Sequence, residues 1–288
     1  MASSKVITDL FKDPAFITQY RNAEKVTGAF APPLVQQSGI ATFQGSPVIL
    51  DSACGTGIVA STLVSMLGDE VKQSWELTCG DLSQGMVEYT RHRARDQGWP
   101  NTEVKLVNAQ DTKLPARHYT HIYAGFGFAS FPDPEGAIKE CSRILKPGGT
   151  IALSAWKNAF WGAIIKAALD TIPEDLPFPE GSGVLRLIHD EPWDSELFVR
   201  SQLEQGGFTD IHINVMSKQI LMGVDEFLKV QDMMLPLVLS RCWTQELREK
   251  HEKRVPAVLR QYLEDKYGPD GSVVIEPVAI IATARKPW

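Results

Sequence analysis

A short loop with two glycines and one acid is the stretch whose residue types could do chemistry. The apolar run Val48–Leu50 predicts a buried strand, and Asp51 stands where that strand ends. The loop Ala53–Gly57 follows and leads into a helical pattern. Its glycines allow a tight turn and bring backbone N–H groups and a helix N-terminus close to a ligand. The run Gly55-Thr-Gly57-Ile-Val-Ala60 also satisfies the dinucleotide fingerprint, which is a weak signal alone.

The charge of Asp51 distinguishes between two kinds of ligand, one that carries a pyrophosphate and one that is a cation. A carboxylate at the strand end repels a pyrophosphate but suits a cation such as S-adenosylmethionine, which carries a sulfonium, an amino group and a single carboxylate. An apolar strand, an acid and a G-x-G-x-G loop resemble the motif of class I methyltransferases, with Ala53 in the place of the first glycine. The alternative is an ordinary α/β turn that holds two glycines.

A second acid follows the next expected strand, Trp75–Asp81. An acid at this place in a parallel nucleotide-binding sheet accepts hydrogen bonds from both ribose hydroxyls, so Asp81 is the predicted ribose ligand. We expect Leu82 and Met86 beside it to contact the cofactor as well. The alternative is that Asp81 only caps the following helix, whose N-cap is predicted at Ser83.

Two further loops are expected at the same edge of the sheet. After the strand Val104–Asn108, the loop 108–115 offers amides and an acid to an adenine amino group. Asn108, Ala109 and Gln110 are the predicted contacts, and Asp111 is an alternative, although a plain turn explains these residues nearly as well. After the strand His121–Phe126, we expect Phe126 beside the methyl donor, because ligands bind beyond the carboxyl ends of parallel strands.

These loops and Arg143-Ile-Leu-Lys-Pro-Gly-Gly149 occur in the order seen in ubiquinone/menaquinone-type class I methyltransferases, which the sequence resembles over residues 46–156. Over nearly its full length it is similar to fungal bis-thiomethyltransferases of the gliotoxin type, which S-methylate reduced epipolythiodioxopiperazines. That likeness lies in Glu24-Lys-Val-Thr-Gly28, Leu77–Ser83, Phe126-Gly-Phe128 with Ser130-Phe-Pro132, Leu176-Pro-Phe-Pro179 and Val258–Tyr262.

The resemblance implies S-adenosylmethionine as the cofactor. Ribose, adenine and methionine contacts then fall to Asp81, to Ala109–Gln110 and to Asp51–Gly57. It also implies an α/β fold: a Rossmann-like, seven-stranded sheet with its last strand antiparallel and helices on both faces. A related N-methyltransferase acts in the same pathway class, so the acceptor atom (sulfur, nitrogen or oxygen) stays open.

One domain is expected over residues 1–288, with a core at 46–156. Residues 1–40 predict an N-terminal helical lid with Tyr20 facing the cofactor, although core packing of Tyr20 is the alternative. The insertions 157–195 and 218–272 predict helical caps over an acceptor. One continuous helix is expected over Thr244–Tyr267. The predicted acceptor contacts are bulky apolar side chains, each of which has core packing as its alternative: Phe128, Trp156, Trp161, Met233 and Met234.

The expected reaction is displacement at the sulfonium methyl, with the protein supplying alignment and a dry pocket. A thiol ionises with a pKa near 8.5 and needs no strong base, whereas a hydroxyl does. Among the histidines, His189 near Glu191 is the candidate base, with a surface or capping role as its alternative. We find no hydrolase motif and no metal-ligand spacing.

The composition argues against nucleic acid and membranes as partners, which leaves a small-molecule acceptor as the expected partner. A net charge of −6 disfavours nucleic acid, and Arg91-His-Arg-Ala-Arg95 is interpreted as a solvated helix face. Four scattered cysteines, no signal region and no apolar run of membrane length predict a reduced, cytoplasmic protein without a membrane partner. The oligomeric state stays open, with a monomer as the candidate. The alternatives are an N- or O-methyltransferase, a non-catalytic regulatory protein that binds S-adenosylmethionine, and a nicotinamide oxidoreductase.

Overall fold

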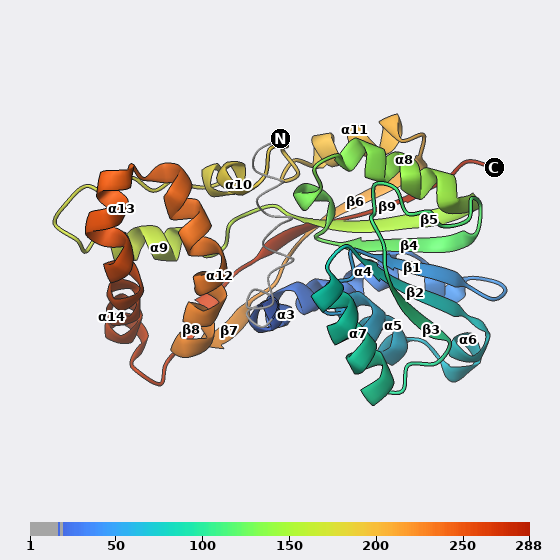
Figure 1. Cartoon of the computed structure of the whole chain (residues 1–288), viewed down its shortest axis with the longest axis horizontal. Helices are drawn as coiled ribbons and strands as arrows, with labels where there is room; N and C mark the ends of the chain where they lie inside the picture. Colours follow the sequence, from blue (N-terminus) through green and yellow to red (C-terminus); the bar gives the residue numbers. More distant parts are fainter. Residues whose placement is uncertain (1–16, 18–19) are drawn as a thin grey trace.

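A seven-stranded sheet forms the centre of the structure, a computed structural model that describes residue 17 and residues 20–288 (Figure 1). The strand order is β3-β2-β1-β4-β5-β9-β6, and only β9 runs antiparallel to its two neighbours. The strands are β1 (Val48–Ser52), β2 (Glu76–Asp81), β3 (Thr102–Leu106), β4 (Tyr119–Gly125), β5 (Leu145–Trp156), β6 (Thr209–Ser217) and β9 (Val278–Arg285). This confirms the predicted seven-stranded sheet with its last strand antiparallel.

Helices cover both faces of the sheet, because side chains alternate between the faces along each strand. On β1, Ile49 joins the core under one helical layer, and Leu50 joins the core under the other. The first layer contains α4 (Ala31–Gln37), α5 (Ile58–Met66), α6 (Asp69–Ser74) and α7 (Gln84–Asp96), and the second contains α8 (Pro134–Ile144) and α11 (Glu196–Gln205) (Figure 1).

The N-terminal segment is helical where the structure describes it, as predicted. From Tyr20 it runs through short turns that lead up to the sheet: η1 (Arg21–Ala23), α3 (Glu24–Thr27), η2 (Gly28–Phe30), α4 and η3 (Ile40–Thr42). The predicted lid over residues 1–40 also includes residues 1–16, 18 and 19, which lie outside the described residues.

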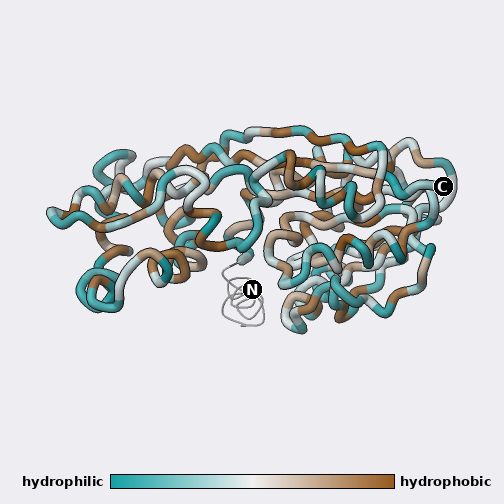
Figure 2. Tube along the Cα trace, turned by 90° about the horizontal axis from the view of Figure 1, so that it is seen from above, coloured by the Kyte–Doolittle hydropathy of each residue, from teal (hydrophilic) through white to brown (hydrophobic). Residues whose placement is uncertain are grey.

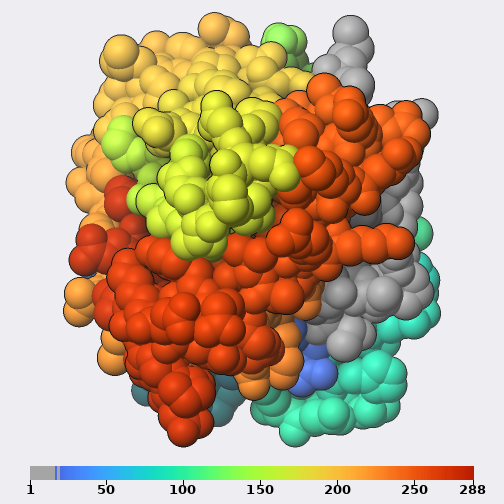
Figure 3. Space-filling model, turned by 90° about the vertical axis from the view of Figure 1, so that its left-hand side faces the viewer, coloured from blue at the N-terminus to red at the C-terminus, as the bar shows by residue number. Residues whose placement is uncertain are grey.

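The two insertions fold together into one lobe beside the sheet. Figure 1 shows the lobe at one end of the molecule, Figure 2 shows apolar stretches in both halves, and Figure 3 shows the two insertions packed together on the outer face. One cluster of buried side chains joins them, from Trp161 and Ile165 to Phe227 and Leu263. The lobe contains α9 (Gly162–Leu169), α10 (Gly183–Ile188), α12 (Val224–Cys242), α13 (Gln245–His251), η5 (Glu252–Arg254) and α14 (Val255–Tyr267).

Two features of the lobe differ from the prediction. The expected helix Thr244–Tyr267 is wrong as one element, because it breaks at η5; Pro256 lacks an N–H and fits the first turn of α14 but not a helix interior. A two-stranded antiparallel sheet, β7 (Ile220–Gly223) with β8 (Ser272–Ile275), joins the ends of the second insertion. Each of these strands has only four residues and its partner lies far away in the chain, so the sequence contains no local pattern that predicts the pair.

Among the residues described, no helix is both long enough and apolar enough to cross a lipid bilayer.

Burial of His121 in β4 makes the stability of the fold sensitive to acid. Its ring lies against Phe43, and Nδ1 bonds to the Thr120 hydroxyl at 3.0 Å. Burial, with a smaller contribution from Arg285, lowers the pKa of His121 to about 4. The unfolded chain therefore binds the proton first, and this contribution to stability is complete above pH 6.5 and lost as the pH falls towards 4.

We expect the wild type to lose about 3 kcal/mol of unfolding free energy through this residue between pH 7 and pH 4. The measurement is urea unfolding at several pH values for the wild type and for His121→Gln, which has no titrating ring. The difference between the two curves should shrink with acid. A constant difference from pH 7 to pH 4 contradicts the assignment.

Candidate active site

Two buried carboxylates lie at the carboxyl ends of β1 and β2. Asp81 accepts hydrogen bonds from the Gly55 N–H at 2.8 Å and from the Ser83 N–H at 2.9 Å, so it ties the glycine loop to the start of α7. Asp51 accepts from the Ala60 N–H at 3.1 Å, in the first turn of α5. Burial raises the pKa of both side chains, that of Asp51 to about 7.

The glycine loop turns through three left-handed positions, Ala53 at φ 51°, Gly55 at φ 54° and Gly57 at φ 78°. The first is the place where the sequence substitutes alanine for the usual glycine, so the structure shows which conformation that residue must adopt. At Gly57 a Cβ atom would also come within 2.9 Å of the Thr90 side chain. The loop therefore packs against α7 as tightly as glycine permits.

A pocket beside this loop, here called the donor pocket, gathers most of the predicted cofactor contacts. They come from the N-terminal segment, the strand ends and the loop 108–115, and they are Tyr20, Ala53, Gly55, Asp81, Leu82, Asn108, Ala109, Gln110 and Phe126. Asp51 lines a smaller adjoining cavity that shares several of these walls.

Two predicted cofactor contacts line neither cavity. Met86 is completely buried, because α7 turns its side chain inward from the first turn, and Gly57 serves the packing of the loop against α7. Asp111, the alternative adenine contact, is also absent from the lining; its exposed carboxylate pairs with Lys113 at 2.7 Å. Ser130, Phe131 and Pro132 line the donor pocket without having been predicted there.

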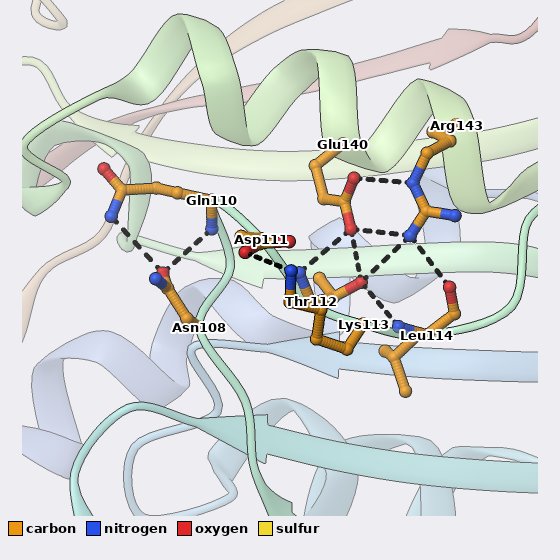
Figure 4. Close-up of polar contacts among 8 residues, drawn as sticks. All are labelled: Asn108, Gln110, Asp111, Thr112, Lys113, Leu114, Glu140 and Arg143. Atoms are coloured by element: carbon orange, nitrogen blue, oxygen red, sulfur yellow. Dashed lines mark hydrogen bonds and ion pairs between the residues drawn. The ribbon is translucent and has the colours of Figure 1, made fainter.

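The loop 108–115 is held by α8 (Figure 4). Glu140 Oε1 accepts from the Thr112 N–H at 2.9 Å, and Arg143 donates both to Glu140 and to the Leu114 carbonyl. The Arg143 guanidinium keeps the pKa of Glu140 low, at about 2. Nearer the pocket, Asn108 Oδ1 accepts from the Gln110 backbone N–H at 3.0 Å. The Arg143 motif therefore supports the predicted adenine loop from behind.

A second cavity, here called the acceptor cavity, adjoins the donor pocket through the shared walls Tyr20, Phe126 and Ser130. The lobe and the end of β5 supply most of its other walls, and the N-terminal segment adds Ala23, Val26 and Thr27. These walls include the predicted residues Trp156, Trp161, His189, Met233 and Met234. Residues from both insertions and from the sheet therefore meet where an acceptor would face the donor.

The prediction that Phe128 contacts the acceptor is wrong, because its ring lies in the core against Phe131 and Trp193. The cause is the backbone of Phe126, which is left-handed at φ 59° and turns the chain after β4. The Phe126 N–H donates to the carbonyl and the hydroxyl of Ser154, both at 3.1 Å. Its ring stacks on Trp156 at 3.9 Å between centroids, on the boundary between the two cavities.

His189 lines the acceptor cavity, and its buried Nδ1 has no hydrogen-bond partner in the described structure. Its ring bonds to the Ala129 backbone, while Nδ1 is buried and accepts or donates no hydrogen bond. Burial lowers the pKa of His189 to about 4, so the ring is neutral near pH 7. A neutral imidazole keeps one nitrogen lone pair, which can accept a proton.

A mostly parallel sheet of this order, with buried acids at the ends of β1 and β2 and a glycine loop between them, defines a nucleoside-binding protein with the class I methyltransferase architecture. The methyltransferase domain family matches residues 49–149. Methyltransferase tpcH of Aspergillus fumigatus is 45% identical over 283 residues, covering 98% of this chain and all of that protein. Acetylaranotin bis-thiomethyltransferase of Aspergillus terreus is 45% identical over 282 residues, covering 98% of each chain.

Among solved structures, phosphoethanolamine N-methyltransferase 2 of Haemonchus contortus, in complex with S-adenosyl-L-methionine, has the same fold, with a TM-score of 0.56 and 14% identity over 96% of this chain and 60% of that one. The chain therefore belongs to the methyltransferase family, as an S-adenosylmethionine-dependent enzyme.

The donor pocket fits this cofactor. Its lining, as far as the structure describes it, contains one acid, Asp81, and no lysine, arginine or histidine. A dinucleotide needs its pyrophosphate charge balanced, whereas a cationic nucleoside is favoured by the Asp51 and Asp81 carboxylates. No group of histidine, cysteine or acidic side chains in the described part of the chain is arranged to hold a metal ion.

The raised pKa of Asp51 makes donor binding depend on pH. A cation bound beside this residue favours its charged form and lowers its pKa, so binding and deprotonation are linked. We expect the affinity for S-adenosylmethionine to be highest above pH 7 and to fall, by at most tenfold per pH unit, as the pH drops below 7. Calorimetric titrations from pH 5.5 to 8.5 measure this. In Asp51→Asn the same series should be nearly flat; an unchanged slope in that variant contradicts the assignment.

Proposed function

We propose that this enzyme methylates a sulfur atom of a small, neutral, largely apolar metabolite, of the reduced dithiol diketopiperazine class found in fungal secondary metabolism. The observation that carries the proposal is the character of the acceptor cavity. Aromatic, methionine and aliphatic side chains wall it, and none of its polar lining side chains in the described structure is charged near pH 7. Such a cavity favours an apolar ring system and disfavours a charged acceptor.

The choice of sulfur is supported by the relative whose name states a thiol acceptor, the acetylaranotin bis-thiomethyltransferase, which matches this chain along its whole length. It is also supported by His189, whose low pKa makes it a weak base. A thiol needs only modest help to ionise near neutral pH, whereas an alcohol needs a much stronger base.

In this proposal S-adenosylmethionine, when bound, supplies an electrophilic methyl group on a sulfonium. Asp81 and the loop Ala53–Gly57 hold the nucleoside, and Asn108 and Gln110 face its adenine ring. The Phe126–Trp156 stack forms the wall that aligns the acceptor and excludes water from the junction of the two cavities. His189 Nδ1 accepts the thiol proton as the sulfur gains its negative charge.

The test is turnover of the purified full chain with S-adenosylmethionine and three acceptors built on one diketopiperazine ring, which carry a thiol, a hydroxyl or an amine. Mass spectrometry identifies the methylated atom. We expect a thioether from the dithiol and little product from the others. Turnover of the hydroxyl or amine compound without any thioether overturns the choice of sulfur and favours an O- or N-methyltransferase.

We also propose a cytoplasmic, monomeric enzyme. The support is that Cys54, Cys79, Cys141 and Cys242 are all unpaired, as expected in a reducing compartment. Fractionation and light scattering of the native protein test the two statements separately.

A further inference from the structure

One arginine of α7 joins the N-terminal segment to the glycine loop. Arg93 Nη1 donates to both carboxylate oxygens of Glu24, at 3.2 Å each, and to the Thr56 carbonyl at 2.9 Å. The side chains of Arg93 and Glu24 are only 15% and 19% exposed. The sequence prediction of a solvated face for Arg91–Arg95 is therefore wrong at Arg93, because Glu24, 69 residues away, covers it.

The glycine loop rests on the same face of α7 through a second contact. The Thr90 hydroxyl donates to the Gly55 carbonyl at 2.7 Å, and Thr90 is three residues before Arg93, so both side chains leave the same side of the helix. Together they bind the carbonyls of two consecutive loop residues, Gly55 and Thr56. Because Gly55 also donates its N–H to Asp81, α7 fixes the loop that lines the donor pocket.

The other partner of Arg93 belongs to the N-terminal segment, which contributes Tyr20 to the site. Glu24 begins α3, four residues after Tyr20, and Tyr20 lines the donor pocket, the adjoining small cavity and the acceptor cavity. A second contact strengthens the attachment to α7, since the Arg21 guanidinium lies 5.3 Å from the centre of the Tyr89 ring. The position of Tyr20 over the site thus depends on how this segment is held on α7.

We propose that Arg93 is a positioning residue that couples the N-terminal segment to the glycine loop, so that binding of the donor nucleoside and closure of residues 20–37 over it favour each other. Arg93 lines none of the three cavities and acts through Glu24 and Thr56. Without its charge, the partly buried Glu24 carboxylate loses its partner and the Thr56 carbonyl loses a donor, so both sides of the contact loosen together. Linkage requires the coupling to be reciprocal.

The experiment uses the full chain and S-adenosylhomocysteine as the probe. Arg93→Met keeps an unbranched apolar stem and removes the guanidinium with its charge. Arg93→Lys restores a single charged nitrogen, which suffices because Nη1 alone makes all three contacts. Arg95→Met is the matched control on the same helix, since Arg95 is 69% exposed and pairs only with its neighbours in the described structure. Calorimetry gives the affinity, and hydrogen–deuterium exchange follows residues 20–37 with and without the probe.

We expect Arg93→Met to weaken binding at least tenfold and to abolish the protection that the probe gives to residues 20–37. Arg93→Lys should stay within about threefold of the wild type, and Arg95→Met should match it. Wild-type affinity and wild-type protection in Arg93→Met overturn the proposal.

A second variant, Glu24→Gln, keeps the proposal testable if Arg93→Met folds poorly. It leaves the Thr56 contact in place and removes the charge on the side of the N-terminal segment. We expect Glu24→Gln to reduce the probe-induced protection and to weaken binding about threefold or more. In the double variant of Glu24→Gln and Arg93→Met, the loss of binding free energy should be smaller than the sum of the two single losses. An unchanged exchange pattern, or fully additive effects, shows that the contact does not couple the two elements.

Discussion

Replacing Asp81 with asparagine is expected to weaken binding of S-adenosylmethionine by roughly 10- to 100-fold, which corresponds to about 1.4–2.8 kcal/mol. The carboxylate ends β2 in the wall of the donor pocket, where a nucleoside presents its ribose hydroxyls. Asparagine keeps one acceptor oxygen, which can still bind the Gly55 or Ser83 N–H, so the variant removes charge and one acceptor with little change in volume.

The melting temperature of Asp81→Asn distinguishes a direct loss of donor binding from misfolding. The pKa of Asp81 is raised by burial, which means that its charged form opposes folding near pH 7 in the absence of ligand. Asp81→Asn should therefore melt within a few degrees of the wild type while binding the donor much more weakly. Calorimetry and thermal melts, with the exposed Asp96→Ala on α7 as control, measure both properties. Unchanged donor affinity in Asp81→Asn removes the ribose assignment.

The donor half of the site could be predicted from the sequence because its signals are local. Asp51 and Asp81 each follow a short apolar strand, and parallel strands bring such ends to one edge of a sheet. The acceptor half was predicted only as a set of bulky residues in two insertions. The lobe that unites them depends on contacts between distant segments, including the unpredicted β7–β8 pair, and no local pattern encodes such contacts.

The errors at individual residues have equally specific causes. Phe126 and Phe128 were both expected to face the cavities, because ligands bind beyond the carboxyl ends of parallel strands. The left-handed backbone at Phe126 turns the chain there and sends Phe128 into the core. Arg93 was expected in solvent because its neighbours are charged, yet its partner Glu24 lies far away in the chain. The spacing of Thr90 and Arg93 on one helix face was the available signal.

Replacing His189 is expected to lower the rate of methyl transfer more than the other substitutions proposed here. In the proposed thiol transfer, its unpartnered Nδ1 accepts the proton, and a positioned general base contributes on the order of 100-fold or more. We therefore expect His189→Gln to lower kcat/KM for a dithiol acceptor about 100-fold at pH 7, with little change in donor affinity, since His189 lines the acceptor cavity and not the donor pocket.

The pH profile identifies the role of this residue. The pKa of His189 is about 4, so its basic form is present throughout pH 5–9 and wild-type activity should hold on the acid side. In His189→Gln the reaction depends on thiolate formed in solution, whose fraction rises towards a pKa near 8.5. The deficit of the variant should then shrink from about 100-fold at pH 7 to a few-fold near pH 9.5. The exposed His212→Gln on β6 is the control and should follow the wild type. A deficit of equal size at every pH means that His189 shapes the cavity without accepting the proton, because lost packing does not depend on the ionisation of the thiol.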